Sequence, residues 1–133
     1  MTRKEIRVLA HTYAARYAGE NGVTLLRLKE LCRAEGIRLI SYKHGAQLLA
    51  ELGLEEHTRG NDAFCIPALS RAIFYNSERE PDTVRGNIAH ELGHLLTVSE
   101  PENVELAELR ADSFAFNLLF PDVARSEGGA ARC

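Results

Sequence analysis

Two histidines and a glutamate lie close together in the second half of the chain, in the run His90-Glu91-Leu92-Gly93-His94. In a helix, residues four apart share a face, so both imidazoles can bind a single metal ion. Imidazole and carboxylate ligands suit zinc, which in hydrolytic sites takes three protein ligands and a water molecule. We expect Glu91 to be the general base that takes a proton from this water and delivers it to the leaving amine. The alternative is a pair of solvent-facing histidines beside an ordinary glutamate.

A third protein ligand has to come from another segment. Thr97 and Glu100 stand where the extended H-E-x-x-H-x-x-G-x-x-H pattern requires Gly and His, which excludes the metzincin arrangement. The following segment offers Glu105, Glu108 and Asp112, whose spacing by three and four places them on one helical face. Periodicity does not choose among the three, and the same residues could form a solvated acidic face.

A hydrolytic site also needs a donor that stabilises the oxyanion of the tetrahedral intermediate. The candidates are Tyr75 and Arg85, with Tyr42 and His44 as weaker choices. Arg85 could equally be a structural arginine that pairs with a carboxylate. Tyr75 could equally be a half-buried tyrosine of a strand.

The histidine motif lies within the most regular helical pattern of the chain. Pro81-Asp82 opens this helix, and Pro101 ends it or the loop that follows. Its buried stripe comprises Val84, Ile88, Leu92, Leu95 and Leu96. A second helix over residues 102–119 is closed by Pro121, and its apolar positions are Val104, Leu106, Leu109, Phe114, Ala115, Leu118 and Leu119.

The first half of the chain predicts further helices. Residues 4–18 have the apolar spacing of an amphipathic helix. Thr24 can cap a second helix, which ends at Gly36. Residues 45–53 predict one or two helical turns, and residues 55–62 predict a polar turn region.

Three short β-like runs predict a small sheet, and they are Ile37–Tyr42, Ala63–Ile66 and Ala72–Tyr75. Pro67 lies between the last two runs and indicates a hairpin arm at a sheet edge. We expect Ala72–Tyr75 to be an edge strand beside the metal, to which a substrate strand adds in antiparallel orientation. The fold class is therefore α+β, with N-terminal helices, a small mixed sheet and two closing helices.

Composition limits the classes of protein that this chain can represent. It has 133 residues, 45% apolar and 26% charged, as in an ordinary folded domain. The net charge of −3 argues against nonspecific binding to nucleic acid, and no apolar run is long enough for a membrane span. The N-terminus lacks a signal-peptide pattern, so we expect a cytoplasmic protein. Cys32, Cys65 and Cys133 form no CxxC pair, which predicts reduced thiols.

Two motifs carry a family resemblance. Residues 85–96, Arg-Gly-Asn-Ile-Ala-His-Glu-Leu-Gly-His-Leu-Leu, resemble the core of the ImmA/IrrE family of zinc metallopeptidases. The family's second signature is a Glu, two residues, Ala, Asp or Asn, one residue, Phe-Ala and a Leu-Leu-x-Pro ending, which stands here from Glu108 to Pro121. Two motifs in this order, about 14 residues apart, are far more specific than either by itself. The resemblance covers residues 37–122 well and the N-terminal helices loosely.

The resemblance implies a domain organisation. A single zincin-like, gluzincin-like metallopeptidase domain would span residues 1–122. Its N-terminal helices would occupy residues 1–36 and its catalytic core residues 37–122. A flexible C-terminal tail would occupy residues 123–133.

The resemblance also implies a site with one Zn²⁺ per chain, bound by His90, His94 and Glu108. Asp112, one turn further on, would orient a ligand histidine and set its tautomer. Many relatives have Glu where this chain has Arg110, a departure that adds a positive charge near the site.

The activity implied is that of a zinc-dependent endopeptidase. Its expected substrate is a helix-turn-helix transcriptional repressor of a mobile element or a stress response. The alternative is a metal-bound module that binds a repressor or a toxin–antitoxin partner without cleaving it. A DNA-binding protein built on residues 4–35 is disfavoured, because the net charge is negative and the apolar face of residues 25–32 resembles core.

Overall fold

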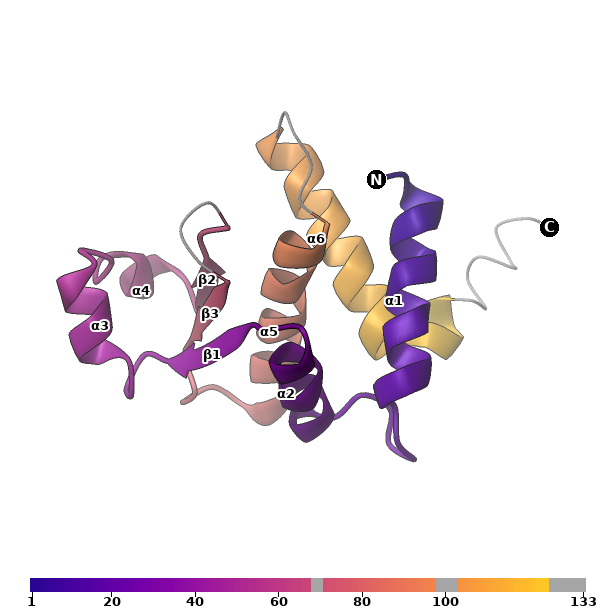
Figure 1. The fold of residues 1–133 in the computed structure, drawn as a ribbon, viewed down its shortest axis with the longest axis horizontal. Helices are drawn as coiled ribbons and strands as arrows, with labels where there is room; N and C mark the ends of the chain where they lie inside the picture. Colours follow the sequence, from indigo (N-terminus) through magenta and orange to yellow (C-terminus); the bar gives the residue numbers. More distant parts are fainter. Residues whose placement is uncertain (68–70, 98–102, 125–133) are drawn as a thin grey trace.

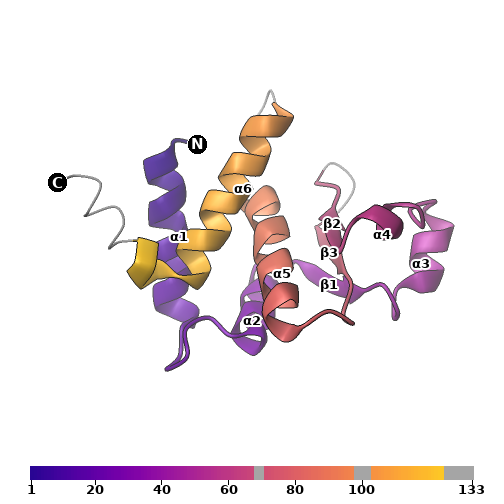
Figure 2. The ribbon, with the colours of Figure 1, turned by 180° about the vertical axis from the view of Figure 1, so that it is seen from behind.

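The computed structural model describes residues 1–67, 71–97 and 103–124 of the chain. Its elements, in chain order, are α1 (Arg3–Tyr17), α2 (Leu25–Ala34), β1 (Arg38–Ser41), α3 (Ala46–Glu51), α4 (His57–Gly60), β2 (Ala63–Cys65), β3 (Ala72–Tyr75), α5 (Pro81–Leu96) and α6 (Val104–Leu119). The four longer helices lie to one side of the small sheet, and α3 and α4 lie to the other (Figures 1 and 2). This arrangement confirms the predicted α+β class.

The sheet has the strand order β1-β3-β2. β1 runs parallel to β3, and β2 runs antiparallel to it, so that Ile40 and Phe64 both lie opposite Phe74. The prediction of an edge strand at Ala72–Tyr75 is therefore wrong, because β3 is the central strand. Its run of three buried residues, Ala72 to Phe74, is typical of a strand that is covered on both faces. The edge position that Pro67 indicated belongs to β2.

Helices α1 and α2 begin where a side chain accepts hydrogen bonds from free backbone amides, and α2 ends just before a glycine. Thr2 and Glu5 form a capping box at the start of α1. The Thr24 side chain accepts a hydrogen bond from the amide of Arg27 at the start of α2, as predicted. Gly36 follows α2 with a φ of +71°, a conformation that favours glycine.

Helix α5 lies at the centre of the main core, between α2, α6 and the sheet. Its buried residues Val84, Ile88 and Leu92 pack there together with Ile73 of β3 and Phe114 of α6. This stripe confirms the predicted apolar face of the helix. The opposite, polar side of α5 is thereby left to face the surface near β2.

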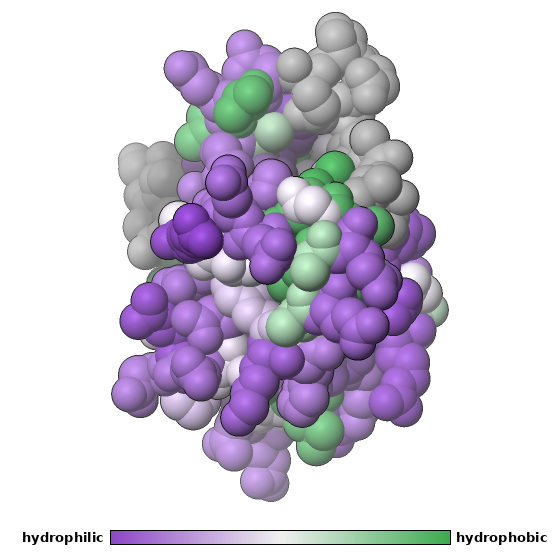
Figure 3. Space-filling view, turned by 90° about the vertical axis from the view of Figure 1, so that its left-hand side faces the viewer, coloured by the Kyte–Doolittle hydropathy of each residue, from purple (hydrophilic) through white to green (hydrophobic). Residues whose placement is uncertain are grey.

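A second apolar cluster covers the other face of the sheet. It contains Leu49, Leu54, Phe64, Ala72 and Phe74. The rings of Phe64 in β2 and Phe74 in β3 stack with centroids 5.2 Å apart. Leu49 of α3 and Leu54, in the same cluster, connect the α3–α4 region to this face of the sheet. The outer surface on this side is mainly hydrophilic, with a narrow band of less polar residues through it (Figure 3).

The polar region 55–62, predicted as a turn, contains the single helical turn α4. The amides of Thr58 and Arg59 bond to the carbonyl oxygens of Glu55 and Glu56, which closes this turn. Asn61 then donates its side-chain amide to the carbonyl of His57.

The apolar stripe predicted for α6 is correct only in the second half of the helix. Phe114 and Leu118 are fully buried, whereas Val104 is 79% and Leu109 64% exposed. Val104 begins α6 where that helix extends past the end of α5 (Figure 1). Leu109 is exposed although the neighbouring Glu108 contacts α5. Pro101 and most of the predicted tail lie outside the described residues. Within the described ranges, no helix combines the length and apolarity needed to cross a bilayer.

Candidate metal centre

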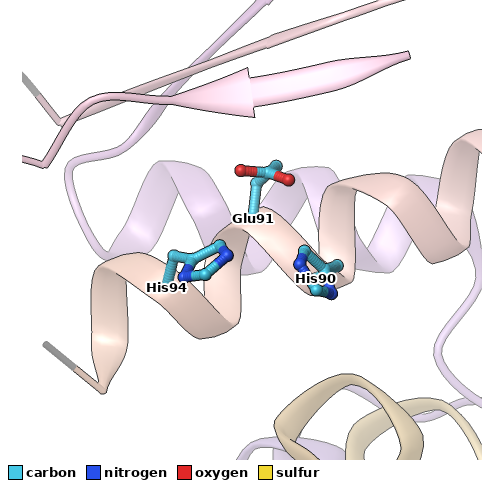
Figure 4. A group of neighbouring side chains, drawn as sticks. All are labelled: His90, Glu91 and His94. Carbon is cyan, nitrogen blue, oxygen red and sulfur yellow. The ribbon is translucent and has the colours of Figure 1, made fainter. Parts of the chain in front are cut away.

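The outward side of α5 presents three side chains that can bind a metal. One potential ligand atom from each of His90, Glu91 and His94 lies within 4.8 Å of the others. Figure 4 shows the two imidazoles on successive turns of α5, with Glu91 directed toward the strands of the sheet. The i and i+4 spacing therefore produces the shared face that the motif predicted.

Helix α6 adds a carboxylate to this group. One oxygen of Glu108, Oε2, lies 3.0 Å from His90 Nε2, and the other, Oε1, lies 2.9 Å from His94 Nε2. A single carboxylate thus spans both rings. Glu105, one of the alternatives that spacing left open, is exposed in the first turn of α6.

Asp112 lies one helical turn beyond Glu108 and contacts the other side of the His90 ring. Its Oδ1 lies 2.8 Å from His90 Nδ1, and a carboxylate at this distance can accept a proton carried by that nitrogen. A neutral His90 then has an unprotonated Nε2, which faces the Glu108 carboxylate as one acceptor facing another. This contact is favourable only when a cation is present, either a second proton on the ring or a metal ion. Two imidazoles and a carboxylate form a known zinc ligand set, so the residues fit a metal.

Glu91 is set back from the two histidines in a partly buried position. Burial raises the pKa of its carboxyl group, while the nearby His94 and His90 oppose that shift. The Cys65 thiol of β2 donates to the backbone carbonyl of Glu91 at 3.7 Å. A carboxylate with a raised pKa is a stronger base than an exposed one, which suits a residue that accepts and returns a proton.

His90, Glu91, His94 and Glu108 line a pocket of about 840 Å³ between the edge of the sheet and the helices α5 and α6. Its lining includes the whole of β2, His57 of α4, and Val104, Ala107, Glu108 and Arg110 of α6. Because β2 pairs only with β3 among the described strands, its outer edge is open to this pocket. The pocket therefore combines a metal-binding group with a free strand edge.

A model of a peptidase family, described as the IrrE N-terminal-like domain, matches residues 32–126. This span is more than half of the chain and contains both motifs of the site. The chain belongs to this family. The resemblance that the two motifs indicated is confirmed, and a metallopeptidase-type protein follows from it. No curated protein and no solved structure gives a significant match.

In this IrrE-like domain, the two main oxyanion candidates lie outside the pocket that His90, Glu91, His94 and Glu108 line. The Arg85 guanidinium donates to the carbonyl of Val23 at 2.9 Å and lies over the ring of Phe120. Tyr75 instead lines a second pocket, beside α2. The alternative prediction for Arg85 was a structural arginine paired with a carboxylate, and its Nε lies 3.9 Å from Asp82 Oδ1.

The two weaker oxyanion candidates are also engaged elsewhere. The Tyr42 hydroxyl donates to the carbonyl of Asn61 at 2.6 Å, and burial raises the pKa of Tyr42 to about 12. The His44 ring forms a 2.9 Å hydrogen bond with the hydroxyl of Ser41. Neither residue is part of the pocket lining.

Among the pocket residues that were not predicted as part of the site, three have side chains that can take part in chemistry: Cys65, His57 and Arg110. Cys65 could have been found, because alternation along β2 places it on the face opposite buried Phe64, toward α5. His57 could not, because its position depends on α4, and its ring packs against Phe64 at 5.1 Å. Arg110 was noted only as a departure from the family pattern, and it lines the pocket directly.

Proposed function

We propose that this IrrE-like domain is a zinc-dependent endopeptidase, with His90, His94 and Glu108 as metal ligands. The observation that carries the proposal is the contact of one Glu108 carboxylate with both histidine Nε2 atoms. Zinc in such a site supplies Lewis acidity and lowers the pKa of a water molecule. A set of two histidines and one glutamate leaves a coordination position open for that chemistry.

Glu91 moves the proton in this proposal. Its carboxylate takes a proton from the attacking water and delivers it to the leaving amine, so that it begins and ends the reaction ionised. Burial raises its pKa and thereby makes it a stronger base than an exposed glutamate. Asp112 orients the His90 ring so that its Nε2 faces Glu108 and the proposed metal position.

The outer edge of β2 is where we place the substrate backbone. The amide of Asn76 bonds to the carbonyl of Asp62, and in an antiparallel pair the bonded positions alternate. The backbone groups of Ala63 and Cys65 therefore point away from β3 and into the pocket. An extended peptide paired with them would pass beside Glu91. This strand replaces the run at residues 72–75 that the sequence favoured.

The substrate class follows from the family resemblance, which supports a DNA-binding helix-turn-helix repressor as the protein that is cut. Cleavage of such a repressor takes place where DNA is, so we place the activity in the cytoplasm. Cys32 and Cys65 are both free thiols, as expected for a reducing compartment.

The test is cleavage of a repressor encoded beside this protein by wild type and by Glu91→Gln, both loaded with zinc. We expect wild type to produce discrete fragments and Glu91→Gln to cleave at least about 100-fold more slowly, because the general base is lost. Mass spectrometry of the fragments identifies the bond. A Glu91→Gln protein that binds zinc and still relieves repression as wild type does would favour the non-cleaving module.

A further inference from the structure

The sheet has a second free edge, on the opposite side from the pocket that His90, His94 and Glu108 line. β1 pairs only with β3 among the described strands, and in Figure 1 it lies at the front of the sheet with α2 beside it. The amides of Arg38 and Tyr42 bond to the carbonyls of Arg71 and Tyr75, on the β3 side. In a parallel ladder successive residues face alternate sides, so the backbone N–H and C=O of Leu39 point outward.

A groove of about 540 Å³ follows this edge. It is lined by residues 36–40 and Tyr75, and by Lys29 and Arg33 of α2. Three cations line it, since Lys29 and Arg33 are one turn apart on α2 and Arg38 begins β1. All three side chains are exposed, and no ion pair involves them within the described part of the chain.

We propose that this groove binds an acidic segment of a partner protein in extended conformation, as an added strand on β1. The outward N–H and C=O of Leu39 would pair with the backbone of the segment. Lys29 and Arg33, four residues apart on one face of α2, would contact acidic side chains on alternate positions of it. The groove thus offers hydrogen-bonding groups for the backbone of such a segment and positive charges for its acidic side chains.

The observations favour a peptide over a nucleic acid. A polyanion bound by charge would need only the cations, and the net charge of the chain is −3. The open strand edge supplies directional backbone groups that a phosphate chain cannot pair with in register. The surface is separate from the metal centre, because β3 lies between β1 and β2. Its occupation therefore requires neither Glu91 nor a metal.

The experiment is a fluorescence anisotropy titration of the full chain with a labelled seven-residue peptide of alternating Glu and Val. We expect saturable binding that weakens as salt is raised. Lys29→Glu/Arg33→Glu should weaken it at least tenfold, whereas Arg3→Glu/Lys4→Glu, the same charge change on α1, should leave it unchanged. Binding should also persist in Glu91→Gln and in the presence of a chelator.

Backbone pairing is tested separately from charge. Leu39→Pro removes the outward N–H, while Leu39→Val keeps it, so only the first should lose binding. Circular dichroism establishes that Leu39→Pro is folded, and a peptide N-methylated at alternate residues gives the same test on unaltered protein. Equal binding of the methylated peptide, or of a single-stranded oligonucleotide of equal charge, would overturn the proposal. Absence of any binding by wild type would do so as well.

Discussion

Glu108 has a side chain that is 53% exposed, and yet each of its oxygens lies within 3.0 Å of a histidine Nε2. An exposed carboxylate can be hydrated, so an ion pair of this kind stabilises a fold only weakly. Its position is better explained by ligand chemistry than by stability. The same holds for Asp112, whose side chain is 69% exposed while it bonds His90.

Asp112→Asn tests the control of the His90 tautomer. The amide NH₂ can donate to Nδ1, which favours the tautomer that is protonated on Nε2 and cannot bind a metal. We expect the zinc affinity, measured by competition with a chromophoric chelator, to fall about 10–100-fold. The free energy of unfolding of the metal-free protein should change by less than about 1 kcal/mol, because the side chain is exposed. Glu105→Gln is the matched control, and equal zinc affinities in both variants would contradict the assignment.

The raised pKa of Glu91 has a consequence for the stability of the metal-free protein. The folded state binds this proton more tightly than the unfolded state, because burial disfavours the carboxylate. Stability is therefore lost as pH rises from the ordinary carboxyl pKa through the raised one. Glu91→Gln does not ionise, so its Tm in chelator should exceed that of wild type by an amount that grows as the pH rises above the ordinary carboxyl pKa of about 4. A difference that stays constant or shrinks with pH would contradict the burial of a titrating Glu91.

At the scale of elements, the close approach of α5 and α6 depends on Gly93. A Cβ at this position would lie 2.9 Å from both the Cα and the carbonyl oxygen of Ala111 on α6. Gly93→Ala should therefore separate the helices beside His94 and Glu108. We expect the free energy of unfolding to fall by about 1–3 kcal/mol and zinc affinity to weaken. Chemical denaturation and chelator competition measure the two effects.

The control for Gly93→Ala lies on the same helix. A Cβ at Gly86 would have no heavy atom within 4 Å. Gly86→Ala should be neutral or should stabilise the protein by up to about 1 kcal/mol, because alanine favours the helix. If both variants behave alike, helix contact at Gly93 does not position the site.

The elements that sequence analysis predicted well are those with a long apolar period or a cap. The stripe of α5 and the cap at Thr24 were confirmed, because both signals are local. Strand order was not predictable, since runs of three or four residues do not specify their partners. Residue spacing likewise could not distinguish Glu108 from the two other acidic residues of α6. The residue that reaches the histidines depends on where α6 crosses α5. At that crossing the backbone of Gly93 lies so close to Ala111 that a Cβ would not fit.

At the scale of the whole molecule, the three-stranded sheet separates two surfaces with different chemistry. The β2 edge faces the proposed metal ligands of α5 and α6, and the β1 edge faces the cations of α2. Zinc would connect α5 to α6, so its binding should also stabilise the whole fold. At a free zinc concentration 100 times the Kd, the added stability would be about 2.7 kcal/mol.

The most direct test of the metal centre is elemental analysis of protein purified without added metal. Wild type and Glu105→Ala should each contain about one zinc per chain, whereas Glu108→Ala should contain little or none, because it loses the third ligand. Circular dichroism confirms that all three proteins are folded. A folded wild type without metal, or a Glu108→Ala protein with a full complement of zinc, would contradict the assignment of His90, His94 and Glu108 as the zinc site.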